Sequence, residues 1–113
     1  AMEMELSLRD GENCRYLSFS GRLDASTSPE AEQALRGKLD DCRALLVDLE
    51  GLSYISSAGL RVLLVIAKRM QSNRGKLVLC RLRPDVKTIF ELSGLTSIFN
   101  ICDDLQSAEN AIC

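Results

Sequence analysis

The sequence predicts an α/β domain in which a mixed β-sheet of about five strands, mostly parallel after an N-terminal hairpin, carries about four helices largely on one face. Three observations predict it. The first residues alternate between apolar and polar, residues 44–47 and 77–79 are continuous apolar runs, and helical patterns separate these segments. The connections are too short to be linkers, so residues 1–113 are expected to form a single domain, with Ala1 a remnant of expression.

Residues 3–9 and 14–20 are the predicted strands of the hairpin. The first alternates cleanly, the second has strand composition, and the polar turn at 10–13 joins them. A turn-rich segment leads from there into a helical pattern. Ser28 and Pro29 have the residue types of a helix start, with the serine as cap and the proline at the first helical position.

A central strand and a long helix follow. The apolar run within 43–49 is typical of a parallel strand that is covered on both faces. Residues 57–71 have a wide apolar stripe, which predicts a helix that buries one face. Gly75 is suited to a left-handed cap at the end of this helix. The helix is expected to expose its other side, which carries Arg61, Val62, Val65 and Lys68.

The last third of the chain predicts two strands and two helices. Residues 76–80 form the next strand, and Pro84 opens a short helix. Residues 97–101 are expected to be an edge strand. Asp103 and Asp104 then start the last helix, where acidic residues complement the positive end of the helix dipole.

Composition excludes several classes of partner. Fourteen basic and sixteen acidic residues give a formal net charge of −2, which provides no broad electrostatic footprint for nucleic acid or for an anionic membrane. No apolar run approaches the roughly 20 residues that a membrane span needs. The acidic N-terminal residues do not resemble a signal sequence, so the cytoplasm is the expected compartment.

The five cysteines are expected to be reduced and structural. Their number is odd, no pair has CxxC spacing, and the chain has no histidine to complete a mixed metal-ligand set. A disulfide framework, a metal site and a cofactor are therefore not expected. The cysteines are Cys14, Cys42, Cys80, Cys102 and Cys113.

The junction between the central strand and the long helix is the candidate functional site. Its serines cannot belong to a Ser-His-Asp triad because histidine is absent, and the sequence around Ser57 has neither a GxSxG elbow nor a phosphate-binding GK[ST] loop. No enzymatic activity is expected. Two interpretations remain: Ser56 or Ser57 caps the helix, or Ser57 accepts a regulatory phosphate. Asp24 is either a local loop-fixing residue or part of the same site.

The segment from Asp48 to Leu60, with the sequence DLEGLSYISSAGL, resembles the central signature of STAS domains, as found in bacterial anti-sigma factor antagonists. Three further matches support the resemblance: GRLD at 21–24, LSGL at 92–95, and the closing helix at 104–112. Together they cover nearly the whole chain in the right order. The resemblance implies a STAS-like mixed sheet and a phosphorylatable serine at the start of the second helix.

In such antagonists the unphosphorylated form binds an anti-sigma factor that has serine-kinase activity, which frees a sigma factor and so regulates transcription. The kinase ends the interaction by phosphorylation, and a serine phosphatase restores it. By position, the resemblance makes Ser57 the phosphoacceptor. The surroundings of that site would be Asp24, Ser56, Ala58 and Gly59, and the partner-binding candidates are Ser26, Thr27, Arg61 and Val62.

The sequence departs from the common Asp-Ser-Ser/Thr-Gly form of the family at two positions. Ser56 stands where the aspartate is usual, and Ala58 stands where a second hydroxyl residue is often found. Ser56 thereby becomes a competing phosphoacceptor. The alternative function is a constitutive, unphosphorylated STAS interaction subunit of a transporter or signalling complex, and small-ligand binding at the helix start is a third possibility.

Overall fold

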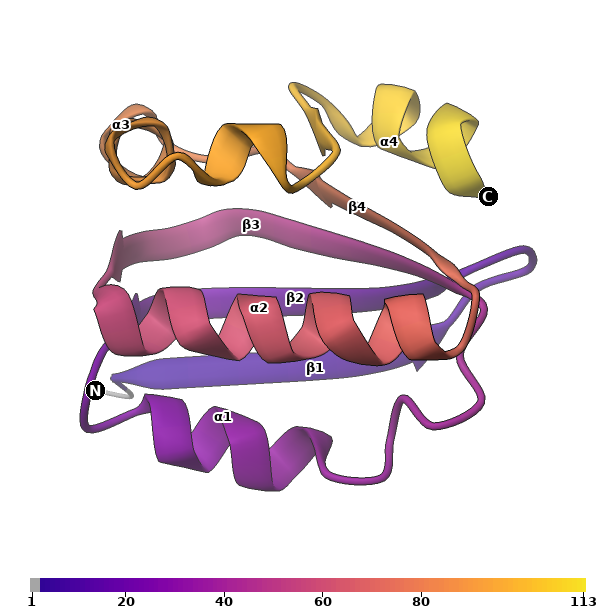
Figure 1. Ribbon diagram of the computed structural model, residues 1–113, viewed down its shortest axis with the longest axis horizontal. Helices are drawn as coiled ribbons and strands as arrows, with labels where there is room; N and C mark the ends of the chain where they lie inside the picture. Colours follow the sequence, from indigo (N-terminus) through magenta and orange to yellow (C-terminus); the bar gives the residue numbers. More distant parts are fainter. Residues whose placement is uncertain (1–2) are drawn as a thin grey trace.

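A mixed sheet organises the protein, whose computed structural model describes residues 3–113; Ala1 lies outside the described residues. Within residues 3–113 the sheet has five strands in the order β1-β2-β3-β4-β5, accompanied by four α-helices and one short 3-10 helix, η1 (Figure 1). The elements are β1 (Met4–Asp10), β2 (Arg15–Leu23), α1 (Ser28–Leu35), β3 (Ala44–Ile55), α2 (Ser57–Ser72), β4 (Lys76–Cys80), α3 (Pro84–Leu92), η1 (Leu95–Ser97), β5 (Ile101–Cys102) and α4 (Leu105–Ile112).

Strand pairing confirms the predicted mixture of directions. β1 and β2 are antiparallel, with registers running from Met4 opposite Gly21 to Asp10 opposite Arg15. β2, β3, β4 and β5 pair in parallel. β3 is longer than the predicted strand because it continues beyond Leu49, and the register between β2 and β3 shifts there. The parallel order brings the ends of β2 and β3 to the same edge of the sheet.

The main core lies between the sheet and the helices α1, α2 and α3. Alternate residues of β3 supply it from the sheet, and α2 supplies Leu63, Ile66 and Met70, which are each at most 3% exposed. Figure 1 shows α2 lying along the sheet, with α1 and α3 on either side of it. Burial of these side chains is the main source of stability for this layer, at roughly 1.5–3 kcal/mol for each large apolar side chain.

Helix α4 covers part of the opposite face of the sheet. It packs Ala108, which is fully buried, against Leu46 of β3 and Val78 of β4 in a second, smaller cluster. Asp104 caps the helix, since its carboxylate accepts a hydrogen bond from the backbone N–H of Ser107 at 2.7 Å. The predicted start of the last helix at the two aspartates is thus confirmed within one residue.

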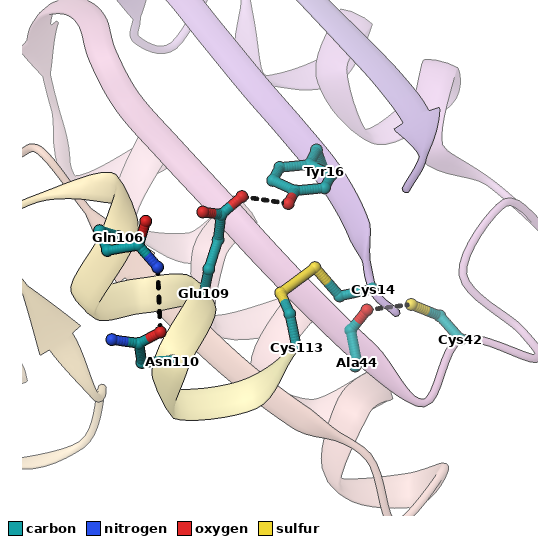
Figure 2. The surroundings of a disulfide bond; sticks show 8 residues. All are labelled: Cys14, Tyr16, Cys42, Ala44, Gln106, Glu109, Asn110 and Cys113. Atoms are coloured by element: carbon teal, nitrogen blue, oxygen red, sulfur yellow. Dashed lines mark hydrogen bonds between the residues drawn. A yellow bond between two sulfur atoms is a disulfide. The ribbon is translucent and has the colours of Figure 1, made fainter. Parts of the chain in front are cut away.

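A disulfide joins Cys14 to Cys113, so the prediction that all five cysteines are reduced is wrong for this pair. Cys14 immediately precedes β2 and Cys113 follows α4, and the bond fastens α4 to the sheet (Figure 2). A hydrogen bond from the Tyr16 hydroxyl to the Glu109 carboxylate supports the same contact. The free thiols within residues 3–113 are Cys42, Cys80 and Cys102.

Three local predictions were also wrong. Ser28 does not cap α1, because it is the first residue of that helix and Thr27 occupies the N-cap position. Residues 97–101 do not form an edge strand, because η1 occupies Leu95–Ser97 and Phe99 turns inward to pack on Phe90 at 5.9 Å between ring centroids. The strand is limited to β5. At the end of α2, Arg74 takes the left-handed conformation (φ 57°) that was expected of Gly75.

Candidate functional site

The candidate site lies where β2 and β3 end side by side. Leu23 of β2 is in register with Ile55 of β3, and the backbone N–H of Ser56 donates to the carbonyl of Leu23 at 3.0 Å. The next residues along the two strands are Asp24 and Ser56. The loop after β2 and the first turn of α2 therefore meet at one edge of the sheet.

Ser57 is the first residue of α2, and its side chain is exposed. Its hydroxyl makes no hydrogen bond within residues 3–113. Ser56 is the N-cap residue in an extended conformation, and its carbonyl accepts the first helical bond from Leu60 at 2.9 Å. The Ser56 hydroxyl is buried and also lacks a partner among the described residues. The capping interpretation of these serines is thus wrong, because neither side chain caps the helix.

Gly59 allows the first turn of α2 to sit against the strand ends. A Cβ atom at this position would lie 2.4 Å from the carbonyl oxygen of Leu23 and 2.6 Å from Cγ1 of Ile55. Both contacts are shorter than any ordinary van der Waals distance. The absence of a side chain at Gly59 therefore fixes how closely Ser57 approaches the loop after β2.

Asp24 fixes that loop through local hydrogen bonds. Its Oδ1 accepts from the backbone N–H groups of Ser26 (3.0 Å) and Thr27 (3.1 Å) and from the Ser26 hydroxyl (2.9 Å). The Thr27 hydroxyl donates to the carbonyl of Arg22 at 2.8 Å. The hydrogen bonds that Asp24 accepts, led by that from the N–H of Thr27, lower the pKa of Asp24 to about 2. The loop-fixing interpretation of Asp24 is confirmed.

An Asp24→Ala substitution should lower stability in a pH-dependent way. The pKa of Asp24 is lower in the folded protein, at about 2, than in the unfolded chain, so its stabilising contribution is present above about pH 4 and is lost as the pH falls through about 2. The difference in urea midpoint between wild type and Asp24→Ala should be full at neutral pH and shrink below about pH 4. The exposed Asp103→Ala serves as control. A difference that is constant with pH would contradict this role.

Of the four partner-binding candidates, two lie at the surface and two do not. Ser26 and Arg61 are exposed. Thr27 is fully buried and Val62 is 2% exposed within the main core, so their side chains are not available to a partner. Val62 could have been recognised as a core residue, because it lies four residues before Ile66 on the apolar stripe that faces the protein interior.

Sequence reasoning missed Arg22 and Tyr54, which flank the site. They are opposite each other in the β2–β3 register, and the guanidinium carbon lies 4.3 Å from the centroid of the tyrosine ring. The Arg22 Nε also lies 3.5 Å from the Asp24 carboxylate. Their proximity depends on the register shift between β2 and β3, which no local pattern in either strand indicates.

The described residues contain no cluster of metal-ligating side chains, and none of the helices within 3–113 is long and apolar enough to cross a membrane. The site thus consists of an exposed hydroxyl at a helix start, beside a rigid loop. Such an arrangement can accept a covalent phosphate at Ser57, where the helix dipole favours negative charge.

Known proteins resemble this chain over almost its full length. A family model described as the STAS domain matches residues 5–108. The relative BtrV of Bordetella bronchiseptica, which is classed among the anti-sigma factor antagonists, is 36% identical and is matched over 96% of this chain and 94% of its own. The anti-sigma-B factor antagonist of Listeria monocytogenes is 30% identical over 88% of each chain. The crystal structure of an anti-sigma factor antagonist from Mycobacterium paratuberculosis superposes with a TM-score of 0.84 at 26% identity, covering 96% of this chain and 93% of that one.

Proposed function

This chain belongs to the STAS domain family, and from that premise we propose that it is an anti-sigma factor antagonist whose docking is switched by phosphorylation of Ser57. The relatives named as anti-sigma factor antagonists support the first part of the proposal. In this function the unphosphorylated protein binds an anti-sigma factor in the cytoplasm and thereby frees a sigma factor. The chain acts by binding and not by catalysis.

The observation that carries the switch is the exposed, unbonded hydroxyl of Ser57 at the first position of α2. A kinase transfers the γ-phosphoryl group of ATP to this oxygen, which loses its proton, and ADP leaves. The phosphate adds about −1.5 to −2 charges and three acceptor oxygens. Because the dipole at the helix start tolerates this charge, the change acts on the docking surface and leaves the fold intact.

Ser57 is a better phosphoacceptor than Ser56. The Ser56 hydroxyl is buried at the cap position, whereas the Ser57 side chain points from the exposed side of the first turn. A kinase active site must reach the hydroxyl oxygen directly, so burial protects Ser56. Phosphopeptide mapping after incubation with the kinase should find the phosphate on Ser57, and phosphate on Ser56 alone would contradict this assignment.

The partners that complete the switch are an anti-sigma factor with serine-kinase activity and a serine phosphatase. The kinase would bind the unphosphorylated chain, modify it and release it. The phosphatase would restore the hydroxyl by hydrolysing the phosphate ester. The rigid loop held by Asp24 lies beside the phosphoacceptor, where both enzymes would contact it.

The Ser57→Asp substitution should weaken binding to the purified anti-sigma factor kinase of the same organism by at least about tenfold, which corresponds to about 1.4 kcal/mol. Ser57→Ala should bind within about twofold of wild type, since it leaves the surface uncharged. Isothermal titration calorimetry measures both. Ser72→Asp, at the opposite end of α2, is the matched control and should bind as wild type does.

Equal binding by wild type, Ser57→Ala and Ser57→Asp would show that charge at Ser57 does not control docking. That result would favour the alternative of a constitutive STAS interaction subunit. If the wild type did not bind the kinase at all, the anti-sigma factor antagonist function itself would be wrong.

A further inference from the structure

The exposed side of α2 carries one continuous line of side chains beyond Ser57. Arg61, Val65 and Lys68 follow it at intervals of four, four and three residues, so they lie along the same surface of the helix. All three are exposed, and Val65 is 48% exposed although it is a large apolar residue. We call Arg61, Val65 and Lys68 the α2 stripe. The distance along the helix axis from Ser57 to Lys68, the far end of the stripe, is about 16 Å.

The charges of the α2 stripe are unbalanced. Residues 57–72 include Arg61, Lys68 and Arg69 but no aspartate or glutamate. Arg69 lies 3.8 Å from the Asp40 carboxylate. In contrast, neither Arg61 nor Lys68 has an ion-pair partner within residues 3–113. The protein has a net charge of −2, yet it leaves two cations unpaired on either side of an exposed valine.

We propose that the α2 stripe is the docking surface for an acidic face of the anti-sigma factor, and that a phosphate on Ser57 competes with that face for Arg61. The inference rests on the proposed function and adds the chemistry of the partner. Carboxylates of the partner pair with Arg61 and Lys68, and an apolar side chain between them covers Val65. A charged rim around an apolar centre is the usual composition of a specific interface.

Competition for Arg61 follows from helix geometry. Ser57 lies four residues before Arg61, and an acid placed four residues N-terminal to a base is the favourable orientation for an ion pair on a helix. The guanidinium and a phosphate form charge-assisted hydrogen bonds. One side chain thus has two alternative partners: a carboxylate of the anti-sigma factor before phosphorylation, and the protein's own phosphate afterwards.

This arrangement makes phosphorylation act twice on the same interface. The phosphate repels the acidic face of the partner directly, and it removes Arg61 as a binding group. Other charged groups near this end of the sheet include Asp24 and Arg22, which lie 3.5 Å apart and belong to the neighbouring loop and strand, and Glu3, whose backbone carbonyl accepts from the Arg22 N–H at 2.7 Å. Of the two unpaired cations of the α2 stripe, Arg61 is the one nearer to Ser57 along the helix.

The competition can be tested on the protein alone by installing phosphoserine at position 57 during translation. The second pKa of the phosphate, followed by 31P NMR, should be lower in the wild-type background than in Arg61→Gln by about 0.2–0.4 pH units. Lys68→Gln is the matched control, because it removes an equal charge about three turns from Ser57. Equal pKa values in the wild-type and Arg61→Gln backgrounds would overturn the competition.

The docking surface is tested by calorimetry with the purified anti-sigma factor kinase of the same organism. Arg61→Gln and Lys68→Gln should each weaken binding by at least about fivefold and reduce its salt dependence. Lys76→Gln, an exposed lysine outside the stripe, should bind as wild type does. If Ser57→Asp loses binding while Arg61→Gln and Lys68→Gln keep it, the stripe is not the docking surface although the proposed function stands. If the wild type does not bind, the proposed function fails first.

Discussion

Reduction of the Cys14–Cys113 disulfide should lower the free energy of unfolding by about 2–5 kcal/mol. The two cysteines are 99 residues apart in sequence. A cross-link over so long a segment removes much of the conformational freedom of the unfolded chain, which the chain-entropy treatment puts at about 4.7 kcal/mol for about 100 residues. The non-covalent contacts of the folded protein are expected to be the same in the oxidised and in the reduced form.

Urea unfolding with and without dithiothreitol measures this effect. Cys113→Ser should reproduce the stability of the reduced wild type, because Cys113 is exposed and its sulfur contributes little besides the bond. The same reductant should not change the stability of Cys113→Ser. A difference of less than about 0.5 kcal/mol between oxidised and reduced wild type would contradict the stabilising role of the disulfide.

Among substitutions at buried positions, Gly59→Ala should have the largest effect on phosphorylation and on partner binding. The added methyl group would approach the Leu23 carbonyl oxygen to 2.4 Å, and a backbone atom cannot move away as a flexible side chain can. The first turn of α2 must therefore shift, at a cost of about 1–3 kcal/mol. Because Ser57 lies on that turn, we expect both phosphorylation and binding of the anti-sigma factor to fall by at least about tenfold.

Gly94→Ala is the matched control for this effect. Gly94 has φ +73°, so alanine there is strained by about 1–2 kcal/mol, but a Cβ atom would meet nothing within 4 Å and the position lies between α3 and η1. The two variants should lose similar stability in urea unfolding. Only Gly59→Ala should lose phosphorylation by the kinase. Equal phosphorylation of both variants would show that the position of the first turn of α2 does not control access of the kinase to Ser57.

The sheet could be predicted because each of its main strands has its own local signal. The alternation of residues 3–9 and the continuous apolar runs in β3 and β4 reflect burial on one face or on two. The 3-10 helix at Leu95–Ser97 could not be predicted in this way. Residues 97–101 have strand composition, but Ser97 ends the 3-10 helix and Phe99 packs on Phe90, so the strand is limited to β5.

The disulfide was beyond prediction for a related reason. Spacing along the chain says nothing about a pair of cysteines separated by almost the whole sequence, and α4 must first return to the sheet before Cys113 reaches Cys14. The odd number of cysteines was a misleading signal, because it shows only that at least one cysteine is unpaired and does not exclude a single disulfide. Three of them remain free thiols, in agreement with the prediction.

For the candidate site, the sequence located the correct junction but not the direction of every side chain. Ser57, Asp24 and Gly59 could be placed from the order of the strands and the start of the helix. The burial of Val62 could be inferred from its spacing to Ile66 on the apolar stripe of α2. The burial of Thr27 depends on how the loop after β2 packs against the core, which local patterns do not define.

The parallel strands also separate the end of the molecule that carries the candidate site from the end that carries the disulfide. Figure 1 shows the first turn of α2 toward one end of the longest axis and the C-terminus toward the other. This axis measures 31 Å, and Cys113 at the C-terminus forms the disulfide with Cys14. Charges so far apart are screened from each other at physiological salt, where the Debye length is about 8 Å. Substitutions that change the surface charge around Ser57 should therefore alter partner binding without altering the contact that the Cys14–Cys113 bond makes at the other end.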